Sequence, residues 1–307
     1  MSDVVPETPQ PTLSVVMIVL NGAPWIGQQL DALAEQRGAP DSWELVVADN
    51  GSTDGTQDIV RSRVDAFPVP LRLVDASGAP GASHARNIGA SAARAPALAF
   101  CDCDDVVHER WAAEASRALA DHDCVMGINR ALQEPRNADS EVLNPGGLVG
   151  RGIQSCNFAV LRDVYFEVGG FDESLPPYGC EDSEFSIRLR ARGYQIAPAF
   201  DMVLYFRRTV GFRRTLGKVY MSGIAETVVW RRHPGAFAHE LSLRTVLVDL
   251  ARWPVWSARE LAARRLSLRR LARTAVNAYA HVVGYVTWIR PDRAGEARLV
   301  FEPYDVG

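Results

Sequence analysis

Short apolar runs that end abruptly at polar turn residues constrain the fold of this chain more than any other feature. Ser14–Leu20 is continuous, apolar and rich in β-branched residues, and it stops at Asn21. Glu44–Ala48 is a second such run, and it stops at the turn formers of Asp49–Gly55. Runs of this kind are typical of strands that are buried on both faces of a parallel sheet. Two more expected strands follow, Leu71–Val74 and Ala97–Phe100.

Helical patterns separate these expected strands. A segment opened by Pro24 places Ile26, Leu30, Leu33 and Ala34 at spacings of three and four, which is the spacing of one helix face. We expect a second helix on which Ile59, Val60 and Val64 face inward. We expect a third helix over His84–Ala93. Alternation of strand and helix predicts a doubly wound α/β fold with a mostly parallel sheet.

The second half of the chain departs from this alternation. Gln133–Gly152 is polar and rich in Pro and Gly, which predicts a long loop. From Arg207 onward the chain becomes basic and helical, so we expect a helical extension over residues 206–307. Between these segments the expected helices are Glu109–Ala120, Arg162–Val168 and Ser183–Arg192, and the expected strands are Cys124–Asn129 and Ser155–Leu161.

A cluster of carboxylates, Asp102, Asp104 and Asp105, follows the fourth expected strand. On extended backbone, Asp102 and Asp104 would point to the same side because they are two positions apart. Two hard oxygen ligands suit Mg²⁺ or Mn²⁺, which take their remaining ligands from phosphate and water. The other interpretation is a solvated acidic turn that caps the next helix, and this segment by itself leaves both open.

Polar residues also stand at other strand ends, which is where open α/β sheets bind their ligands. Asn21 ends the first expected strand and Asp49 ends the second. Asp49 could accept a hydrogen bond from a base or a ribose hydroxyl, or it could cap the next helix. Arg86 follows a Gly-rich loop, where its guanidinium could contact a diphosphate or could simply face solvent.

Glu181 and Asp182 form a second acidic pair, at the start of an expected helix. A carboxylate beside a loop can take a proton from a hydroxyl group and so act as a general base. Acidic residues are also common at a helix N-terminus, where their charge interacts favourably with the helix dipole. The pair by itself does not decide between these two roles.

Bulk properties exclude several classes of protein. The net charge of −4 argues against a general nucleic-acid binder. Five cysteines without a Cys-x-x-Cys pair favour free thiols in a reducing cytosol. Residues 1–12 are polar and Pro-rich, lack the order of a signal peptide, and are expected to be a disordered lead. The sequence has no apolar stretch long enough to span a membrane, so we expect a cytoplasmic protein.

In combination, these segments resemble glycosyltransferase family 2, whose members have the GT-A fold. The resemblance covers about residues 13–205, because each matching segment occurs in the family's order and spacing. The matching segments are Leu13–Asn21, Glu44–Asp54, Ala85–Gly89, Phe100–Asp105, Asn157–Glu173 and Gly179–Leu189.

This resemblance implies an inverting enzyme that moves one sugar from a nucleoside-diphosphate sugar to an acceptor hydroxyl. It implies that Asp49 contacts the base, that Asp102 lies in the ribose or metal shell, and that Arg86 lies near the diphosphate. Asp104 would be the main ligand of Mn²⁺ or Mg²⁺, and Asp182 the base. Residues 13–105 would form the nucleotide half of the catalytic domain and residues 106–205 the acceptor half. Asn21 and Glu181 are further expected substrate contacts.

Two departures from the family pattern refine this expectation. Processive members carry Gln-x-x-Arg-Trp, and nothing of that form follows Asp182, so we expect a single transfer. Where many members carry a metal-binding His, this chain has Tyr205–Arg208, and an arginine there could share in neutralising the diphosphate. The acceptor could be a glycan, a lipid-linked molecule or a small molecule.

Two other functions remain as alternatives. One is a sugar-nucleotide-binding protein without activity, although Asp102, Asp104 and Asp182 argue against it. The other is a nucleotidyltransferase, which should carry a basic Gly-rich loop after the first strand. Asn21–Trp25 contains no basic residue, so this alternative ranks low.

The C-terminal third is strongly basic. Ala251–Ala275 holds seven arginines against the single acid Glu260. Within residues 251–290 this pattern fits an interfacial segment that contacts anionic lipid. It fits equally a helical subdomain whose arginines lie on a solvated face.

Overall fold

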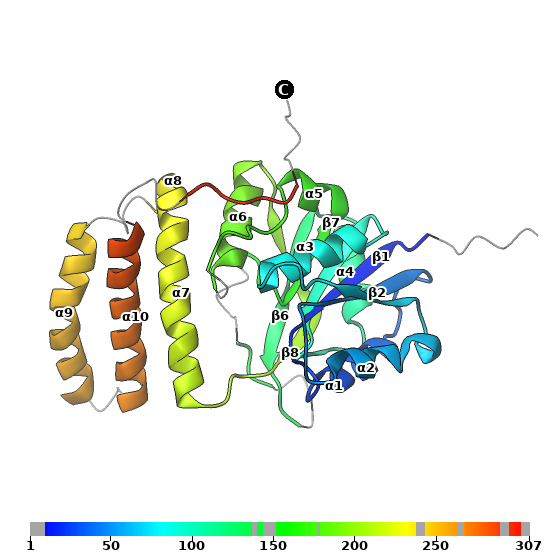
Figure 1. Cartoon of the computed structure of the whole chain (residues 1–307), viewed down its shortest axis with the longest axis horizontal. Coiled ribbons are helices and arrows are strands. Elements are labelled where there is room, and N and C mark those ends of the chain that lie inside the picture. The colour runs from blue at the N-terminus through cyan, green and yellow to red at the C-terminus, as the bar shows by residue number, and fades with distance from the viewer. Residues whose placement is uncertain are drawn as a thin grey trace, which may run out of the picture.

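The computed structural model describes residues 10–134, 136, 140–143, 152–176, 179–237, 243–262, 267–288 and 295–301. Within these ranges an eight-stranded sheet with flanking helices forms the larger body, and three long helices stand beside it (Figure 1). The expected lead over residues 1–12 lies mostly outside the described residues, as do parts of Gln133–Gly152 and of Pro176–Gly179.

The sheet combines a parallel half with a mixed half. Its strands run in the order β3-β2-β1-β4-β7-β6-β8-β5. Neighbours among β1 to β4 pair in parallel, whereas β7 pairs antiparallel with both β4 and β6. The strand bounds are β1 Leu13–Val19, β2 Trp43–Asp49, β3 Leu71–Asp75, β4 Ala97–Asp102, β5 Val106–Val107, β6 Cys124–Ala131, β7 Asn157–Leu161 and β8 Ile196–Phe206.

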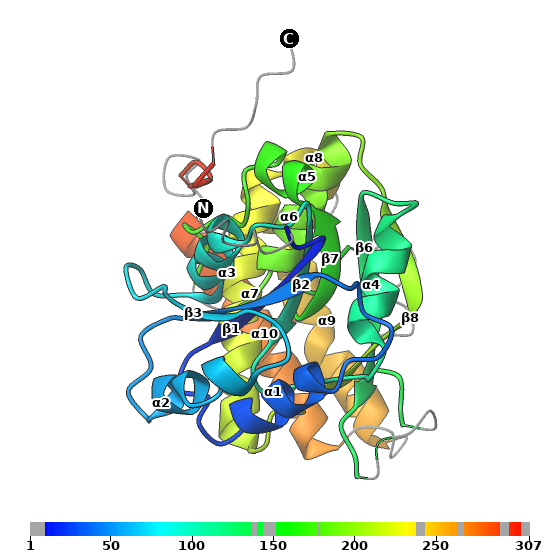
Figure 2. The ribbon, with the colours of Figure 1, turned by 90° about the vertical axis from the view of Figure 1, so that its right-hand side faces the viewer.

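Helices cover both faces of this sheet, and Figure 2 shows α3 and α4 on opposite sides of the strands. The helix bounds are α1 Ile26–Ala34, α2 Thr56–Arg61, α3 Ala82–Ala92, α4 Trp111–Leu119, α5 Arg162–Glu167, α6 Glu181–Ala191, α7 Phe212–Arg232, α8 Pro234–Phe237, α9 Leu243–Ala262 and α10 Leu268–Trp288, with a short 3₁₀ helix at Val64–Ala66.

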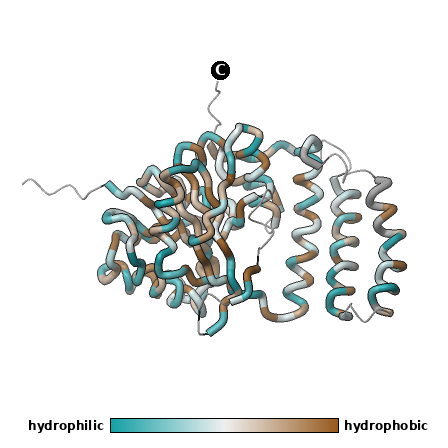
Figure 3. The backbone as a smooth tube through the Cα atoms, turned by 180° about the vertical axis from the view of Figure 1, so that it is seen from behind, coloured by the Kyte–Doolittle hydropathy of each residue, from teal (hydrophilic) through white to brown (hydrophobic). Residues whose placement is uncertain are grey.

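Alternation along β1 divides the core between the two faces. Val15 and Met17 pack in one cluster with Leu30 of α1, whereas Val16 packs in the other with Ala90 of α3. Successive side chains of a strand point to opposite faces, so one continuous apolar run supplies both clusters. The hydrophobic positions are accordingly concentrated in the central strands in Figure 3.

An aromatic cluster packs α6 against one face of the sheet. Phe100 of β4 stacks on Phe158 of β7, with ring centroids 4.6 Å apart. Phe171 stacks on Phe185 of α6 at 4.7 Å, and Phe158 lies 6.0 Å from Phe185. Because β4 and α6 share this cluster, the end of β4 and the start of α6 have a defined spatial relation.

The expected fold class is confirmed, and two details of the prediction are wrong. Val64, expected to face inward on a helix, is 38% exposed, because α2 ends at Arg61 and Val64 lies in the separate 3₁₀ turn. Strand β8 was not anticipated. Its run contains Pro198 and Asp201, residues that are depleted from strands, and its pairing with β6 shifts register at Gly127.

The three long C-terminal helices pack in a row beside the α/β body, with α7 nearest to it and α9 farthest (Figure 1). Small residues bring α7 and α10 together, because a Cβ on Gly223 would lie 2.8 Å from that of Ala280. None of the helices described is long and apolar enough to cross a bilayer. The domain boundaries expected at residues 12, 105 and 205 stay predictions.

Residues 295–301 return from the helices to the α/β body (Figure 1). The ring of Phe301 lies 4.3 Å from that of Phe166 on α5. The backbone N–H of Arg298 donates to Asp172 Oδ1 at 2.9 Å, and Arg232 of α7 pairs with the other oxygen of Asp172. Asp172 therefore ties the turn before α6 to both α7 and the C-terminal segment.

Candidate functional site

A cavity of about 580 Å³ opens where the end of β4, the start of α6 and one side of α7 meet. Its walls also include residues from the ends of β6 and β8 and from the segment before β7. The charged residues that line it are Asp102, Asp104, Glu181, Asp182 and Glu226, together with Arg86, Arg207 and Lys218. The cavity therefore contains both acidic clusters that the sequence singled out.

The first cluster lies in a turn rather than on extended backbone. Strand β4 ends at Asp102, and Asp104 occupies the turn that follows, so the expected extended geometry is wrong. The side chains still converge, because oxygens of Asp102, Asp104 and Asp105 all lie within 4.8 Å of one another. The structure thus adds Asp105 to the two ligands expected from the sequence.

Asp105 is 1% exposed and only partly satisfied. Its Oδ1 accepts a hydrogen bond from the Arg207 backbone N–H at 2.8 Å. Its Oδ2 is buried without a hydrogen-bond partner in the described part of the chain. Burial, followed by the charges of Asp104 and Asp102, raises the pKa of Asp105 well above its ordinary value.

This arrangement fits a divalent cation. Burial and the neighbouring Asp102 also raise the pKa of Asp104. The nearby charges of Lys218 and Arg207 do not offset this rise, and a bound cation would supply further positive charge to the crowded carboxylates. The donor set is entirely oxygen, which is the chemistry that Mg²⁺ and Mn²⁺ prefer.

Arg86 connects the two acidic clusters. Its Nη2 donates to Asp102 Oδ1 at 3.0 Å and its Nη1 donates to Glu181 Oε1 at 3.2 Å. The side chain is 3% exposed and its guanidinium lies 5.4 Å from the ring centroid of Phe171. Burial disfavours the charged form, but Asp102 and Glu181 outweigh it, so the pKa of Arg86 is raised. Arg86 is therefore a buried bridge and not a solvated surface residue.

Asp182 differs from its neighbour Glu181 in how its oxygens are used. Glu181 Oε1 accepts hydrogen bonds from Arg86 and from Ser155 Oγ. Asp182 Oδ1 accepts from the Ser183 N–H at 2.7 Å, whereas Oδ2 accepts none from the residues described. Burial, followed by the charge of Glu181, raises the pKa of Asp182 to about 7. A carboxyl group with a pKa near neutrality at a cavity wall suits general acid–base chemistry.

Asp49 lies at the same edge of the sheet, in a second cavity. Its Oδ2 accepts hydrogen bonds from the Ser52 N–H at 3.1 Å and Gln57 Nε2 at 2.7 Å. Its Oδ1 is buried and has no partner among the described residues. The second cavity, of about 510 Å³, is lined by Asp49, Gly51, Gln57, Arg61, Leu73, Val74, Asp75 and Ser77. Since β2 and β4 both flank β1, the two cavities open at one edge.

Asn21 forms hydrogen bonds within the protein. It has a φ of +52°, and its Oδ1 accepts the Thr53 N–H at 2.9 Å. Its own N–H donates to Ser52 Oγ at 2.8 Å. Asn21 therefore ties the end of β1 to the loop after β2, and it is not a lining residue of either cavity. Its expected contact with substrate stays a prediction.

Several lining residues were not identified from the sequence. Lys218, Ser222 and Glu226 of α7 recur every four residues, which signals one face of a helix. Nothing in the pattern showed that this face would meet α6. Asn129, Gln154 and Ser155 likewise reach the cavity from segments without a distinctive motif.

Comparison with family models identifies two matching stretches. The model described as glycosyl transferase family 2 matches residues 14–170, about half of the chain. The model described as the N-terminal domain of galactosyltransferase matches residues 147–209. Together they include both acidic clusters of the first cavity and end before α7 begins.

Curated relatives point in the same direction. Validoxylamine A glucosyltransferase from Streptomyces hygroscopicus subsp. limoneus is 31% identical over 224 residues, covering 60% of this chain and 49% of that protein. Glycosyltransferase AglE from Haloferax volcanii is 27% identical over 253 residues, covering 79% and 80%. The chain spans about half the length of the validoxylamine A glucosyltransferases that it matches.

Solved structures share the fold. The mannosyltransferase PcManGT from Pyrobaculum calidifontis, solved in complex with GDP-Man and Mn²⁺, aligns with a TM-score of 0.62 at 20% identity, covering 91% of this chain and 88% of that one. Staphylococcus aureus TarS 1–349 in complex with UDP-GlcNAc aligns with a TM-score of 0.53 at 17% identity, covering 91% of each chain. These likenesses confirm the expected GT-A-type architecture.

Proposed function

Because the chain belongs to glycosyl transferase family 2, we propose that it moves one sugar from a nucleoside-diphosphate sugar to an acceptor hydroxyl, with inversion at the anomeric carbon. The observation that carries the proposal is that Asp104 and Asp182 line one cavity. Asp104 would lie at the leaving group and Asp182 would be the base for the incoming hydroxyl, both within reach of one donor molecule.

The donor would lie along the edge of the sheet, across the two cavities. Asp49 would receive a hydrogen bond from the base, and its buried, unpartnered Oδ1 supports this role. Asp102 would lie beside the ribose. Arg86, Arg207 and Lys218 provide positive charge near the acidic turn, where the diphosphate would bind.

Asp102, Asp104 and Asp105 would hold Mn²⁺ or Mg²⁺. When bound, such an ion supplies positive charge to the departing diphosphate. The chain's own residues position this turn. Arg207 Nε donates to the Asp104 backbone oxygen at 2.8 Å, and the Arg207 N–H donates to Asp105. The related mannosyltransferase structure that contains Mn²⁺ supports this choice of ion.

Asp182 would act as the base. Its Oδ2 is not engaged by the described residues, whereas Glu181 is held by Arg86 and Ser155. As the acceptor oxygen bonds to the anomeric carbon, its proton passes to Asp182, and the bond to the diphosphate oxygen breaks. Displacement in one step, without a covalent sugar–enzyme intermediate, inverts the configuration.

We further propose a single transfer rather than polymer synthesis, because Gln-x-x-Arg-Trp is absent after Asp182. The acceptor would be a glycan, a lipid-linked molecule or a small molecule. The related proteins are named for different acceptors, validoxylamine A and poly(ribitol-phosphate).

One assay separates this function from its alternatives. The protein is incubated with Mn²⁺, a panel of UDP-, GDP-, ADP- and dTDP-sugars, and glycan, lipid-linked and small-molecule acceptors, and the release of nucleoside diphosphate is measured. A parallel incubation contains nucleoside triphosphates. We expect release with one donor class, and NMR of the glycoside product should show an inverted anomeric centre. Nucleotide binding without any release would instead indicate an inactive binding protein. Release of pyrophosphate from a nucleoside triphosphate would indicate a nucleotidyltransferase.

We also propose that α9 contacts anionic lipid. Leu247, Val255 and Trp256 of α9 are 53%, 57% and 38% exposed. Arg252 and Arg259 on the same helix are exposed as well. Apolar side chains flanked by arginines on an outer helix favour a surface with negative headgroups.

A further inference from the structure

One wall of the first cavity comes from α7, outside both segments that match family models. Lys218, Ser222 and Glu226 are spaced by four residues and therefore lie on one stripe of the helix. The family matches end at residue 209, whereas α7 begins at Phe212. This wall is thus the part of the cavity that is least determined by membership of the family.

The stripe has a fixed position relative to Asp182. The loop before α6 touches α7 through its backbone, because a Cβ on Gly179 would lie 2.9 Å from Ser222 Cα. Cys180 Sγ also lies 3.8 Å from the Ser222 backbone oxygen. Gly179 and Cys180 directly precede the acidic pair of α6, and Asp182 and the stripe line the same cavity.

Charge is distributed unevenly along this wall. Lys218 lies at the end that holds the acidic turn, where its charge opposes the rise in the pKa of Asp104. Glu226 lies at the other end, close to Cys180. Burial raises the pKa of the Cys180 thiol first, and the charges of Glu226 and Asp182 raise it further. Lys218 therefore lies near the acidic turn, whereas Glu226 lies near Cys180 and Asp182.

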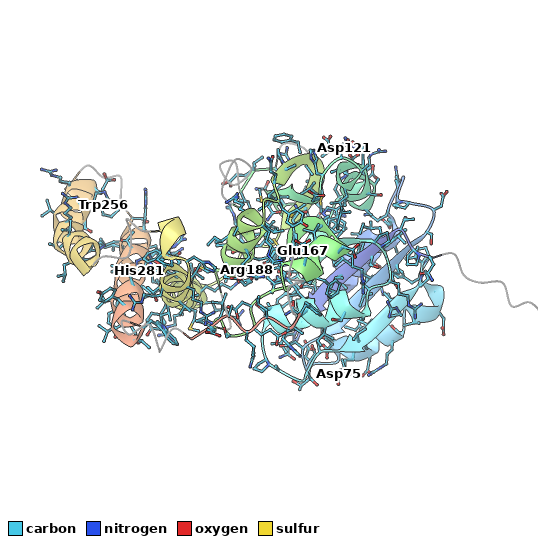
Figure 4. The ribbon with its side chains drawn as sticks, turned by 90° about the horizontal axis from the view of Figure 1, so that it is seen from above. Asp75, Asp121, Glu167, Arg188, Trp256 and His281 are labelled. Carbon is cyan, nitrogen blue, oxygen red and sulfur yellow. The ribbon has the colours of Figure 1, made fainter. Side chains whose placement is uncertain are left out.

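Glu226 is held in place by α10. Its Oε2 lies 2.7 Å from His281 Nε2, and Figure 4, in which His281 is labelled, shows α10 beside α7. The ring of Trp230 lies 5.0 Å from that of His281. The Glu226 side chain is 35% exposed, so it is both oriented and accessible from the cavity. An oriented, accessible carboxylate is a recognition group for hydrogen-bond donors and for cations.

We propose that Glu226, oriented by His281, is an acceptor-specificity residue that selects a polyhydroxylated acceptor carrying a protonated amine. Glu226 adds a carboxylate to the part of the cavity that holds Asp182, and this charge favours an amine over a neutral hydroxyl and disfavours a carboxylate or phosphate. This inference rests on the proposed function, because it assigns the acceptor of that same site.

The test compares three matched probes, methyl β-D-glucosaminide, methyl β-D-glucoside and methyl β-D-glucuronide. The full chain is loaded with Mn²⁺ and with whichever of UDP, GDP, ADP and dTDP it binds, and the affinities of the three probes are measured by NMR titration. We expect the amine to bind most tightly and the carboxylate most weakly. In Glu226→Gln the advantage of the amine over the neutral sugar should fall about tenfold, the scale of a charge-assisted hydrogen bond. Glu226→Asp should restore part of it.

Glu260→Gln is the matched control, because it removes the same charge from α9, away from the cavity. It should leave the order of the three probes unchanged. An amine preference that survives Glu226→Gln, or wild type without an amine preference, would overturn the proposal. The affinity for the nucleoside diphosphate, measured in the same samples, distinguishes a failure of this inference from a failure of the proposed function. Wild type that binds none of UDP, GDP, ADP and dTDP with Mn²⁺ would overturn the proposed function together with this inference.

Discussion

Asp104 and Asp182 line the same cavity, although Asp104 lies in the turn after β4 and Asp182 lies in the first turn of α6. The relationship arises because the end of β4 and the start of α6 share the aromatic cluster around Phe158. Arg86 reinforces it by bonding to Asp102 on one side and Glu181 on the other. The buried guanidinium of Arg86 thus connects the two acidic clusters, which line one cavity.

Replacing the proposed base should abolish turnover without abolishing donor binding. We expect Asp182→Asn to lower kcat by roughly two to four orders of magnitude, the scale of losing a general base. The donor dissociation constant should change little. Initial rates and calorimetric titration check this. Asp201→Asn, at an exposed aspartate of β8, is the matched control and should behave as wild type. Normal turnover in Asp182→Asn would show that this residue only caps α6.

The rate should depend on pH through Asp182. Its pKa is raised to about 7, so the reactive carboxylate form increases as the pH rises through neutrality. At saturating donor and acceptor, kcat should rise between about pH 6 and 8 and then level off. Rates measured across this range check the prediction, and a rate that is flat from pH 6 to 8 would contradict it.

Stability should respond to Asp182 in the opposite sense. Because its pKa is raised, the Asp182 carboxyl holds its proton more tightly in the folded state than in the unfolded state. Its contribution to the free energy of unfolding therefore falls as the pH rises from about 4 to 7. Asp182→Asn removes the group and should flatten that part of the melting-temperature profile. A profile with an unchanged slope over that interval would contradict the shifted pKa.

Divalent cations should stabilise the protein through the acidic turn. Because Asp102, Asp104 and Asp105 converge, Mn²⁺ should raise the melting temperature, as any ligand of the native state does. Asp104→Asn should remove most of this increase, whereas Asp121→Asn, at an exposed site after α4, should keep it. Thermal scans with and without Mn²⁺ decide the matter. An equal increase in wild type and Asp104→Asn would place the ion elsewhere.

The close approach between Gly179 and α7 should be intolerant of a side chain. Gly179 has a φ of +95° and would place a Cβ 2.9 Å from Ser222 Cα, so Gly179→Ala should cost about 2–4 kcal/mol of unfolding free energy. Gly193→Ala is a sharp comparison, because Gly193 has a φ of +89° but no atom within 4 Å of the added Cβ. It should cost only about 1 kcal/mol, the backbone penalty alone. Equal losses in denaturant titrations would show that the contact with α7 is unimportant.

Lipid contact through α9 should be electrostatic and depend on salt. Vesicles rich in phosphatidylserine should sediment the protein at low ionic strength, and Arg252→Glu with Arg259→Glu should weaken this strongly, because each arginine contributes about 1 kcal/mol near such a surface. Arg37→Glu with Arg117→Glu changes the charge equally at exposed positions on the α/β body and serves as control. Equal sedimentation of both double variants would argue against a role for α9.

The edge of the sheet that holds Asp49 and the acidic turn was predictable from the sequence because its signals are local. The buried run of β1 and the turn formers after β2 and β4 identify strand ends, and strand ends identify the site. The same logic could not find β8, whose pairing is formed over a long sequence separation and includes a register shift. Nor could it reveal that the backbone turns at Asp104, which brings Asp105 into the cluster.

The side of the cavity formed by α6 and α7 was less predictable because it depends on packing between helices. Arg86 could have been a surface residue, and only its burial between Asp102 and Glu181 shows its bridging role. The sequence shows that Lys218, Ser222 and Glu226 recur every four residues. It does not show which elements pack against α7, and this depends on the close contacts of Gly179 with Ser222 and of Gly223 with Ala280. Such contacts rest on tertiary shape, which no local pattern encodes.

The most direct measurement is a crystal structure with Mn²⁺ and the intact donor sugar bound to Asp182→Asn, with data collected at the manganese edge. An anomalous peak among Asp102, Asp104 and Asp105 is expected, with the anomeric carbon of the sugar facing residue 182. A manganese peak elsewhere, or a sugar that points away from residue 182, would contradict the assignment of one site to both acidic clusters.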